Sequence, residues 1–138
     1  MSYVVQQAVQ ARLVASAPRM ETVPTTLRYD REDPFAVSVD FPPQATLEGV
    51  EVSWAFAREL LAAGVSAPAG AGDVRIRPYG YDRTVLEFHA REGVAVVHMH
   101  TSELRVFLER TEALVPSGHE QSFLDVDRGV AELLRDTC

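Results

Sequence analysis

Four side chains on two neighbouring predicted strands have the chemistry of metal ligands. His98 and His100 alternate along one strand, so both imidazoles fall on one face, with His89 on that face of the neighbouring strand but further along. Two histidines at this spacing can bind zinc if a third ligand converges, and Glu87, diagonal to His98, could supply it. No cysteine and no further His-x-Glu pattern supports such a site. We therefore interpret the histidines as partly exposed sheet residues and expect no metal and no cofactor.

The turn Gly70-Ala71-Gly72-Asp73 has the composition of a phosphate-binding loop. Known loops of this kind follow a strand and open a helix, or carry a lysine that reaches the phosphate. Here a predicted helix precedes the turn, a predicted strand follows it, and the chain contains no lysine. A tight turn that uses the conformational freedom of glycine is the better interpretation.

Nucleophilic side chains are present, but they lack the sequence context that would activate them. Ser66 and Ser117 have no nucleophile-elbow sequence around them, and the single cysteine, Cys138, lies at the end of the chain. The carboxylate pairs Glu32–Asp33 and Asp125–Asp127 fall where turns and helix caps are expected. The sequence therefore favours a protein that is not an enzyme.

Composition places the chain among soluble single-domain proteins. Its 138 residues are 46% hydrophobic and 24% charged. The N-terminus has no basic flank and no long apolar run, so we expect no secretory signal and a cytoplasmic location.

The charge balance bears on nucleic-acid binding. The formal net charge is −7, with 13 basic residues against 20 acidic ones, and an excess of negative charge opposes the approach of phosphates. Single-stranded nucleic-acid binding, which needs a basic groove with aromatic platforms, remains the alternative function. One local cluster has that composition: Arg75, Arg77, Tyr79, Tyr81 and Arg83.

Charged and aromatic residues are also dense between Leu27 and Phe35. Arginine and tyrosine are frequent anchors of protein interfaces, whereas a solvated turn held by arginine–carboxylate pairs explains the same residues equally well. The candidate partner-binding residues of this segment are Arg28, Tyr29, Asp30, Arg31, Asp33 and Phe35.

Alternating and β-favouring residues predict the strands that position these side chains. The predicted strands are Tyr3–Ala15, Leu27–Asp30, Phe35–Phe41, Leu47–Ser53, Val74–Pro78, Thr84–Ala90 and Val94–His100. In the third strand, Phe35, Val37, Val39 and Phe41 share one face. The last two strands form a hairpin. If Leu86 pairs with Val97, the core face comprises Leu86, Phe88, Ala95, Val97 and Met99.

Helical spacing and stop signals predict two longer helices and a short one. The first covers residues 54–63, with Ser53 as N-cap, Gly64 as the stop and Phe56, Leu60 and Leu61 facing inward. The second covers residues 103–114, with Ser102 as N-cap and an apolar face of Leu104, Phe107, Leu108 and Thr111. Asp125 or Asp127 caps the short last one. Residues 67–72 form a flexible loop, and strands followed by helices indicate the α+β class.

Several ordered blocks resemble one family of bacterial proteins. Residues 27–37 resemble the segment LRYDxxDPYAV, residues 54–64 resemble WxFARxLLxxG, and residues 68–78 resemble PxGxGDVRxxP. Residues 107–111 and 115–120 are similar to FLxRT and VPxGxE, in the same order. Over roughly residues 9 to 135 the chain therefore resembles the SsgA-like proteins, the sporulation-specific septation proteins of filamentous actinobacteria.

This resemblance implies a non-enzymatic, cytoplasmic protein that acts at the cell septum. It implies recruitment or stabilisation of the tubulin-like protein FtsZ, or binding of other SsgA-like or septal proteins, with the membrane reached only through partners. It also implies a single domain over residues 1–138, whose ends can be flexible, in which two curved antiparallel β-sheets and helices form a Whirly-like fold that assembles as a homotrimer. The short length favours the SsgB type. Arg77, where the family often has an aromatic residue, and the loose match of residues 119–128 leave the subtype open.

The blocks that carry the resemblance are expected to stabilise the fold rather than to touch a partner. Their residues with this expected structural role are Trp54, Phe56, Arg58, Leu60, Leu61, Gly64, Gly70, Gly72, Asp73 and Pro78.

Overall fold

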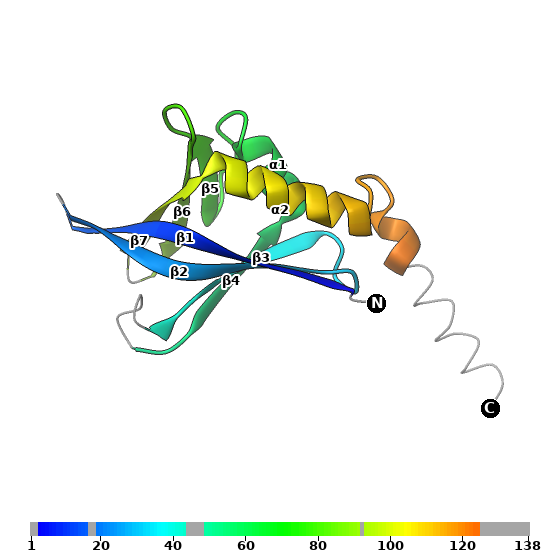
Figure 1. Ribbon diagram of the computed structural model, residues 1–138, viewed down its shortest axis with the longest axis horizontal. Coiled ribbons are helices and arrows are strands. Elements are labelled where there is room, and N and C mark those ends of the chain that lie inside the picture. The colour runs from blue at the N-terminus through cyan, green and yellow to red at the C-terminus, as the bar shows by residue number, and fades with distance from the viewer. Residues whose placement is uncertain (1–2, 17–18, 44–48, 92, 125–138) are drawn as a thin grey trace.

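The computed structural model describes residues 3–16, 19–43, 49–91 and 93–124 (Figure 1). The elements follow the order β1 (Val4–Ser16), β2 (Arg19–Asp30), β3 (Ala36–Phe41), β4 (Val52–Ala57), α1 (Arg58–Gly64), β5 (Val74–Pro78), β6 (Arg83–Ala90), β7 (Gly93–His100) and α2 (Thr101–Leu114). All these strands join one antiparallel sheet in the order β4-β3-β2-β1-β7-β6-β5. Helix α2 lies along the sheet and packs on β1 and β7.

The sheet consists of two meanders, β1–β4 and β5–β7, that meet where β1 pairs with β7. Among the described residues, three residue pairs form this junction, from Arg12–His98 to Val14–Val96. The sheet curls until Phe88 of β6 meets three rings of the other meander. Its ring centroid lies 5.7 Å from that of Phe41, 5.2 Å from Trp54 and 6.1 Å from Phe56. The predicted α+β class is confirmed, and the two expected curved sheets are the two halves of a single sheet.

Alternation along the strands sets the inner face of the sheet. In β3, Val37, Val39 and Phe41 are buried as predicted. Phe35 precedes the strand and is 48% exposed, so the prediction that it shares one face with these three residues is wrong. The hairpin register is confirmed, because Leu86 pairs with Val97.

The boundary between β4 and α1 differs from the prediction of a strand to Ser53 and a helix from Trp54. Trp54 pairs with Val39 and Phe56 with Val37, so both aromatic side chains project from a strand into the core. Aromatic residues favour strands, and pairing with β3 outweighs the helical spacing of the following residues. Ser53 is not a helix cap: its hydroxyl donates to the Asp40 carboxylate at 2.5 Å. The predicted strand residues 47 and 48 lie outside the described residues.

Helix α2 begins two residues earlier than predicted, and a residue from another segment caps it. Ser102 lies inside the first turn, where its N–H and hydroxyl donate to the two carboxylate oxygens of Asp82 at 3.0 and 3.1 Å. A carboxylate is favourable at a helix N-terminus because the free N–H groups there carry partial positive charge. Leu104, Phe107 and Thr111 are buried as expected. The predicted last helix, from residue 125, lies outside the described residues.

Two glycines let α1 and the following turn lie close to β5. A Cβ on Gly64 would lie 2.4 Å from the Ile76 Cβ, so this glycine is needed for close packing; it is the last residue of the helix, and its predicted role as a stop in the left-handed conformation is not seen. Gly70 has a φ of +96°, and a Cβ there would lie 2.5 Å from the Val74 carbonyl oxygen. The loop expected to be flexible is fixed to β5 by two backbone hydrogen bonds between Ala69 and Ile76, of 2.8 and 2.9 Å.

Candidate functional site

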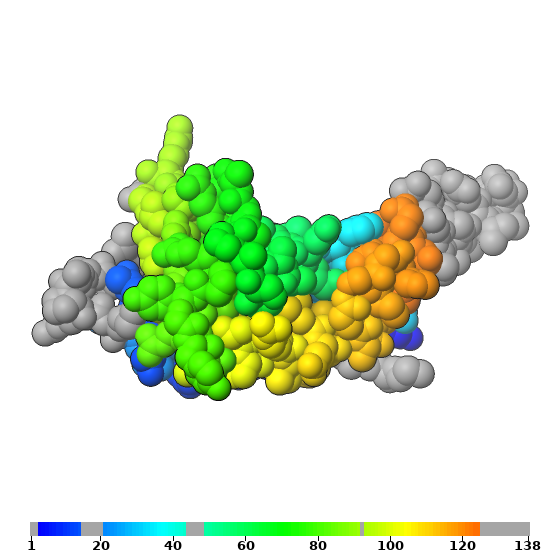
Figure 2. Space-filling model, turned by 90° about the horizontal axis from the view of Figure 1, so that it is seen from above, coloured from blue at the N-terminus to red at the C-terminus, as the bar shows by residue number. Residues whose placement is uncertain are grey.

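Arg58, the first residue of α1, has a side chain that is only 4% exposed. Its guanidinium donates to the carbonyl oxygens of Thr111 and Val115 at 3.2 and 2.7 Å and pairs with the Glu120 carboxylate at 2.6 Å. A buried charge is tolerated when it is paired and its donors are satisfied. Arg58 therefore joins α1 to the end of α2 and to the segment after it, and Figure 2 shows the surface of α2, yellow to orange, beside the green surface of α1 and β5.

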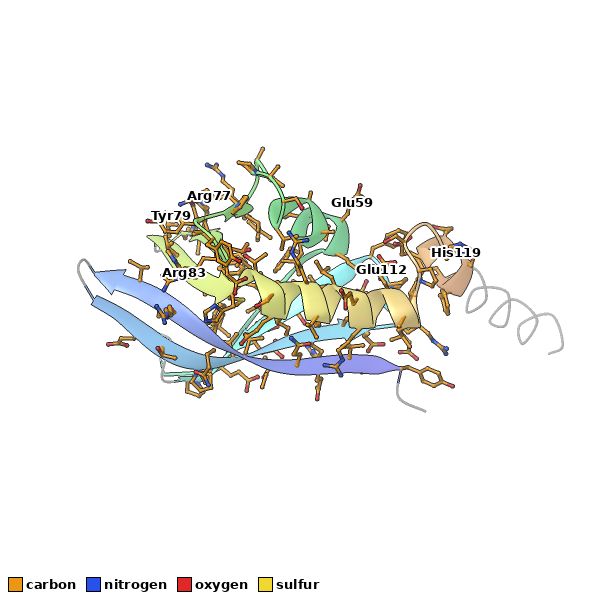
Figure 3. The ribbon with its side chains drawn as sticks, turned by 45° about the horizontal axis from the view of Figure 1, so that its top comes forward. Glu59, Arg77, Tyr79, Arg83, Glu112 and His119 are labelled. Atoms are coloured by element: carbon orange, nitrogen blue, oxygen red, sulfur yellow. The ribbon has the colours of Figure 1, made fainter. Side chains whose placement is uncertain are left out.

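The chain after α2 folds back so that Glu120 can reach Arg58. Ser117 donates its N–H to the Glu112 carboxylate at 2.8 Å, and the Gly118 N–H donates to the second Glu120 oxygen at 2.9 Å. The hydrogen bond from Arg58 holds the pKa of Glu120 below its ordinary value of 4.5. Glu112 and His119 lie at this end of the molecule in Figure 3.

Tyr29 is also part of this buried cluster. Its side chain is 1% exposed, and the guanidinium carbon of Arg58 lies 4.9 Å from the ring centroid. Its phenol donates to the Pro34 carbonyl oxygen at 2.9 Å, and burial raises the pKa of Tyr29 to about 12. The prediction that Tyr29 binds a partner is corrected, because this side chain is enclosed in the core.

The remaining predicted contact residues divide into two groups. Arg28, Asp30 and Asp33 line a shallow hollow on the outer face of β2, β3 and β4, which we call the outer hollow. Small or medium-sized residues complete it: Ala36, Val37, Ser38, Ser53 and Ala55. Arg28 is 45% exposed, and its Nε lies 3.7 Å from the Asp40 carboxylate. Both signs of charge therefore meet beside a surface without bulky side chains.

Arg31 lies away from the outer hollow and holds the N-terminal strand. Its guanidinium carbon lies 3.7 Å from the Tyr3 ring centroid and 5.5 Å from that of Phe123, while its backbone N–H donates to the Tyr3 carbonyl oxygen. Phe35 is exposed and precedes Ala36, so a large, accessible apolar ring lies next in sequence to the hollow.

The family-motif residues are divided between the core and the exposed turn. Asp73 accepts the backbone N–H of His89 through its carbonyl oxygen at 2.7 Å, which fixes the glycine turn to β6. Leu61 is fully buried, Leu60 packs against the core, and Pro78 ends β5 at an exposed position. Gly72 is exposed in the turn, with open space where a Cβ would lie.

The candidate metal ligands make separate contacts. His89 lies 3.1 Å from a Glu87 oxygen, whereas His100 lies 3.6 Å from Asp82. Glu87 also pairs with Arg77, and hydrogen bonds from Arg77 and His89 hold the pKa of Glu87 below its usual range. Among the described residues, no three His, Cys, Asp or Glu side chains lie close enough together to hold a metal ion. In the same part of the chain, no helix is long and apolar enough to cross a membrane.

Sequence reasoning missed that three separate motif blocks meet at one buried arginine. Arg58 comes from the second block, Thr111 ends the fourth, and Val115 and Glu120 begin and end the fifth. A signal was present: Arg58 falls among apolar residues of a short helix, where a charged side chain needs a buried partner.

Comparison with known proteins identifies the class. Residues 23–120 match the family model described as Streptomyces sporulation and cell division protein, SsgA, and the chain belongs to this family. It is 40% identical over 129 residues to the sporulation-specific cell division protein SsgB of Streptomyces coelicolor, covering 91% of this chain and 92% of that one. The SsgB of Salinispora tropica is 43% identical over 126 residues, with 89% and 87% covered.

Solved structures agree with this assignment. An SsgA-like sporulation-specific cell division protein from Thermobifida fusca superposes with a TM-score of 0.84 at 31% identity, covering 96% of this chain and 98% of that one. A structure of SsgB from Streptomyces coelicolor gives a TM-score of 0.78 at 36% identity, covering 87% and 94%. The resemblance drawn from the motif blocks is thereby confirmed.

Proposed function

We propose that this protein is a non-enzymatic scaffold for sporulation-specific septum formation, which marks the division site and recruits or stabilises FtsZ. The observation that carries the proposal is the match to SsgB proteins along almost the whole chain, at 40% identity over 91% of its length for the Streptomyces coelicolor relative.

We place the FtsZ contact at the outer hollow and the exposed ring of Phe35. Ala55 and Ser53 lie on β4, an edge strand of the sheet, so a partner can approach from the outer face and from the side. Arg28, Asp30 and Asp33 offer both signs of charge. Such charges fix how a partner is oriented and which partner binds, more than they raise the affinity.

Sedimentation with FtsZ polymers tests the proposal. Ala55→Arg puts a long charged side chain into the outer hollow from an exposed position, so the fold should tolerate it. We expect the unaltered protein to sediment with FtsZ and Ala55→Arg to lose at least about tenfold in affinity, as for a contact worth about 1.4 kcal/mol. Ala62→Arg, at an exposed position of α1, is the matched control and should bind normally. No co-sedimentation of the unaltered protein, and no change in FtsZ bundling, would refute FtsZ binding. Equal binding by both variants would refute the location.

We further propose that the chain acts as one domain, that it assembles as a homotrimer, and that it works at the septum. An assembled scaffold presents several copies of one surface to a polymer, which raises avidity without new contacts. Light scattering should give three times the 15.2 kDa mass of the chain. A purely monomeric mass at high concentration would contradict the trimer.

A further inference from the structure

The outer face of β1, β7, β6 and β5 carries arginines in register. Arg12 lies opposite His98, His98 opposite Val85, and Val85 opposite Arg77, so the four form one row across the four strands. Arg83 is paired with His100 and lies diagonal to His98 on the same face. We call Arg12, Arg77, Arg83, His98 and His100 the arginine face. Figure 3 shows Arg77, Tyr79 and Arg83 gathered at one end of the molecule.

Two of these arginines keep their charge uncompensated. Arg77 is paired with Glu87. Within the described part of the chain, neither Arg12 nor Arg83 forms an ion pair with a carboxylate. A second acid, Asp82, lies 3.6 Å from His100, and both of its carboxylate oxygens accept hydrogen bonds from Ser102.

His98 lies between these charges with an unsatisfied nitrogen. The residue is 8% exposed, and its buried Nδ1 has no hydrogen-bond partner among the described residues. Desolvation first, and then the positive charges of Arg83, Arg77 and Arg12, lower the pKa of His98. Buried polar atoms are rarely left unpaired, so an atom of this kind indicates the position of a bound water.

Two adjoining hollows open on this face and share Arg83 and His100. One is small, with a volume of about 10 Å³ that suits a single water molecule, and is lined by Gln10, Arg12, Arg83, His98, Met99 and His100. The other is lined by Tyr79, Gly80, Tyr81, Asp82, Arg83 and His100. Tyr79 is 55% exposed with its ring 5.3 Å from that of His98, and Tyr81 is fully exposed. Cations and an imidazole therefore stand beside two accessible aromatic rings.

We propose that the arginine face binds the phosphoryl group of a small ligand that also carries a flat ring, as a nucleotide does. Arg12 and Arg83 pair with the phosphate oxygens, for which the planar guanidinium fork is well matched. His98 lies beneath the two guanidinium groups and contacts the phosphoryl group through a bridging water, for which the small hollow has room. Tyr79 and Tyr81 supply the surface for the ring. A small ligand fits better than a polymer, because the net charge of −7 repels a long polyanion.

A titration of the histidine ring signals by NMR tests this site in the full chain. The chain has four histidines, so His89 and His119 serve as internal controls, and His98→Gln assigns the signal of interest. Inorganic phosphate, adenosine 5′-monophosphate and adenosine are added at constant ionic strength. We expect the His98 signal to shift and saturate with phosphate and, at lower concentration, with the monophosphate, and to stay unchanged with adenosine.

Variants then separate binding from general charge effects. Arg12→Met and Arg83→Met should each weaken monophosphate binding about tenfold, and Tyr79→Ala should reduce it to the affinity for phosphate. Arg105→Met, at an exposed position of α2, is the matched control and should bind normally. The proposal is overturned if His98 does not shift, if all histidines shift alike, or if Arg12→Met and Arg83→Met bind as tightly as Arg105→Met. It is also overturned if only an oligonucleotide or anionic lipid vesicles move the His98 signal.

Discussion

Replacement of Arg58 by methionine should destabilise the protein more than loss of any surface arginine. Methionine keeps the apolar stem, so the change removes the three polar contacts of the guanidinium and leaves most of the packing in place. Removing one partner of a buried ion pair costs about 3–5 kcal/mol. Two features place the cost of Arg58→Met at the lower end of this range, at about 3 kcal/mol. The Glu120 side chain is 15% exposed and can turn towards water, and the Thr111 carbonyl oxygen still accepts the Val115 N–H at 2.8 Å.

Urea unfolding followed by the fluorescence of Trp54, the one tryptophan, measures this cost. With a denaturant slope of about 1.5 kcal/mol per molar, a loss of about 3 kcal/mol lowers the midpoint by about 2 M. Measurements at one protomer concentration are needed, because assembly makes apparent stability depend on concentration. Arg58→Lys keeps the charge but lacks the planar fork, so its midpoint should fall between those of the unaltered protein and Arg58→Met.

Arg75→Met is the matched control for this series. Arg75 is exposed on β5, and its Nε donates only to the Gly72 carbonyl oxygen at 3.3 Å. Its loss should change the free energy of unfolding by less than about 0.5 kcal/mol. If Arg58→Met and Arg75→Met unfold at the same urea concentration, the buried cluster does not stabilise the fold and the reasoning fails.

Three further predictions follow from the same packing. Gly64→Ala should cost about 1–3 kcal/mol because its Cβ would overlap Ile76, whereas Gly72→Ala has open space and should be neutral; equal thermal melting points for the two would contradict this. Arg58 lowers the pKa of Glu120 in the folded protein. The ion pair therefore contributes fully to the free energy of unfolding above pH 4.5, and this contribution is lost as the pH falls through the folded-state pKa of Glu120. Urea midpoints should therefore fall with acid less steeply for Glu120→Gln than for the unaltered protein, and parallel curves would exclude the effect. Tyr29→Phe leaves the Pro34 carbonyl oxygen without its donor and should lower the free energy of unfolding by about 1 kcal/mol, with no change as the opposing result.

Local sequence patterns predicted the elements whose side chains alternate regularly. The pairing of Leu86 with Val97 followed from the period of two, because a shift by one residue would have turned every apolar side chain away from the core. Helical spacing located Leu104, Phe107 and Thr111 correctly for the same kind of reason. The end of β4 was missed, because residues 54–57 also fit the helical pattern of Leu60 and Leu61, and only pairing with β3 decides between the two.

The candidate surfaces could be predicted only in part. Arg28, Asp30 and Asp33 were identified as contact candidates from composition, and the structure places them together at the outer hollow. Tyr29, between Arg28 and Asp30, faces the opposite side of the sheet and is buried, because successive residues of a strand point to opposite faces.

By itself the sequence determined the α+β class, the hairpin register and membership of the SsgA family. These depend on local periodicity and on ordered blocks of residues, which are visible in one dimension. Only the tertiary structure decided which separate blocks meet: Arg58 reaches Glu120, 62 positions away, and Arg12 joins Arg83 and His98 on one outer face. Such contacts depend on how the sheet curls and where α2 packs. Residues this far apart in the sequence are brought together by the packing of the whole core, which no local pattern of residues describes.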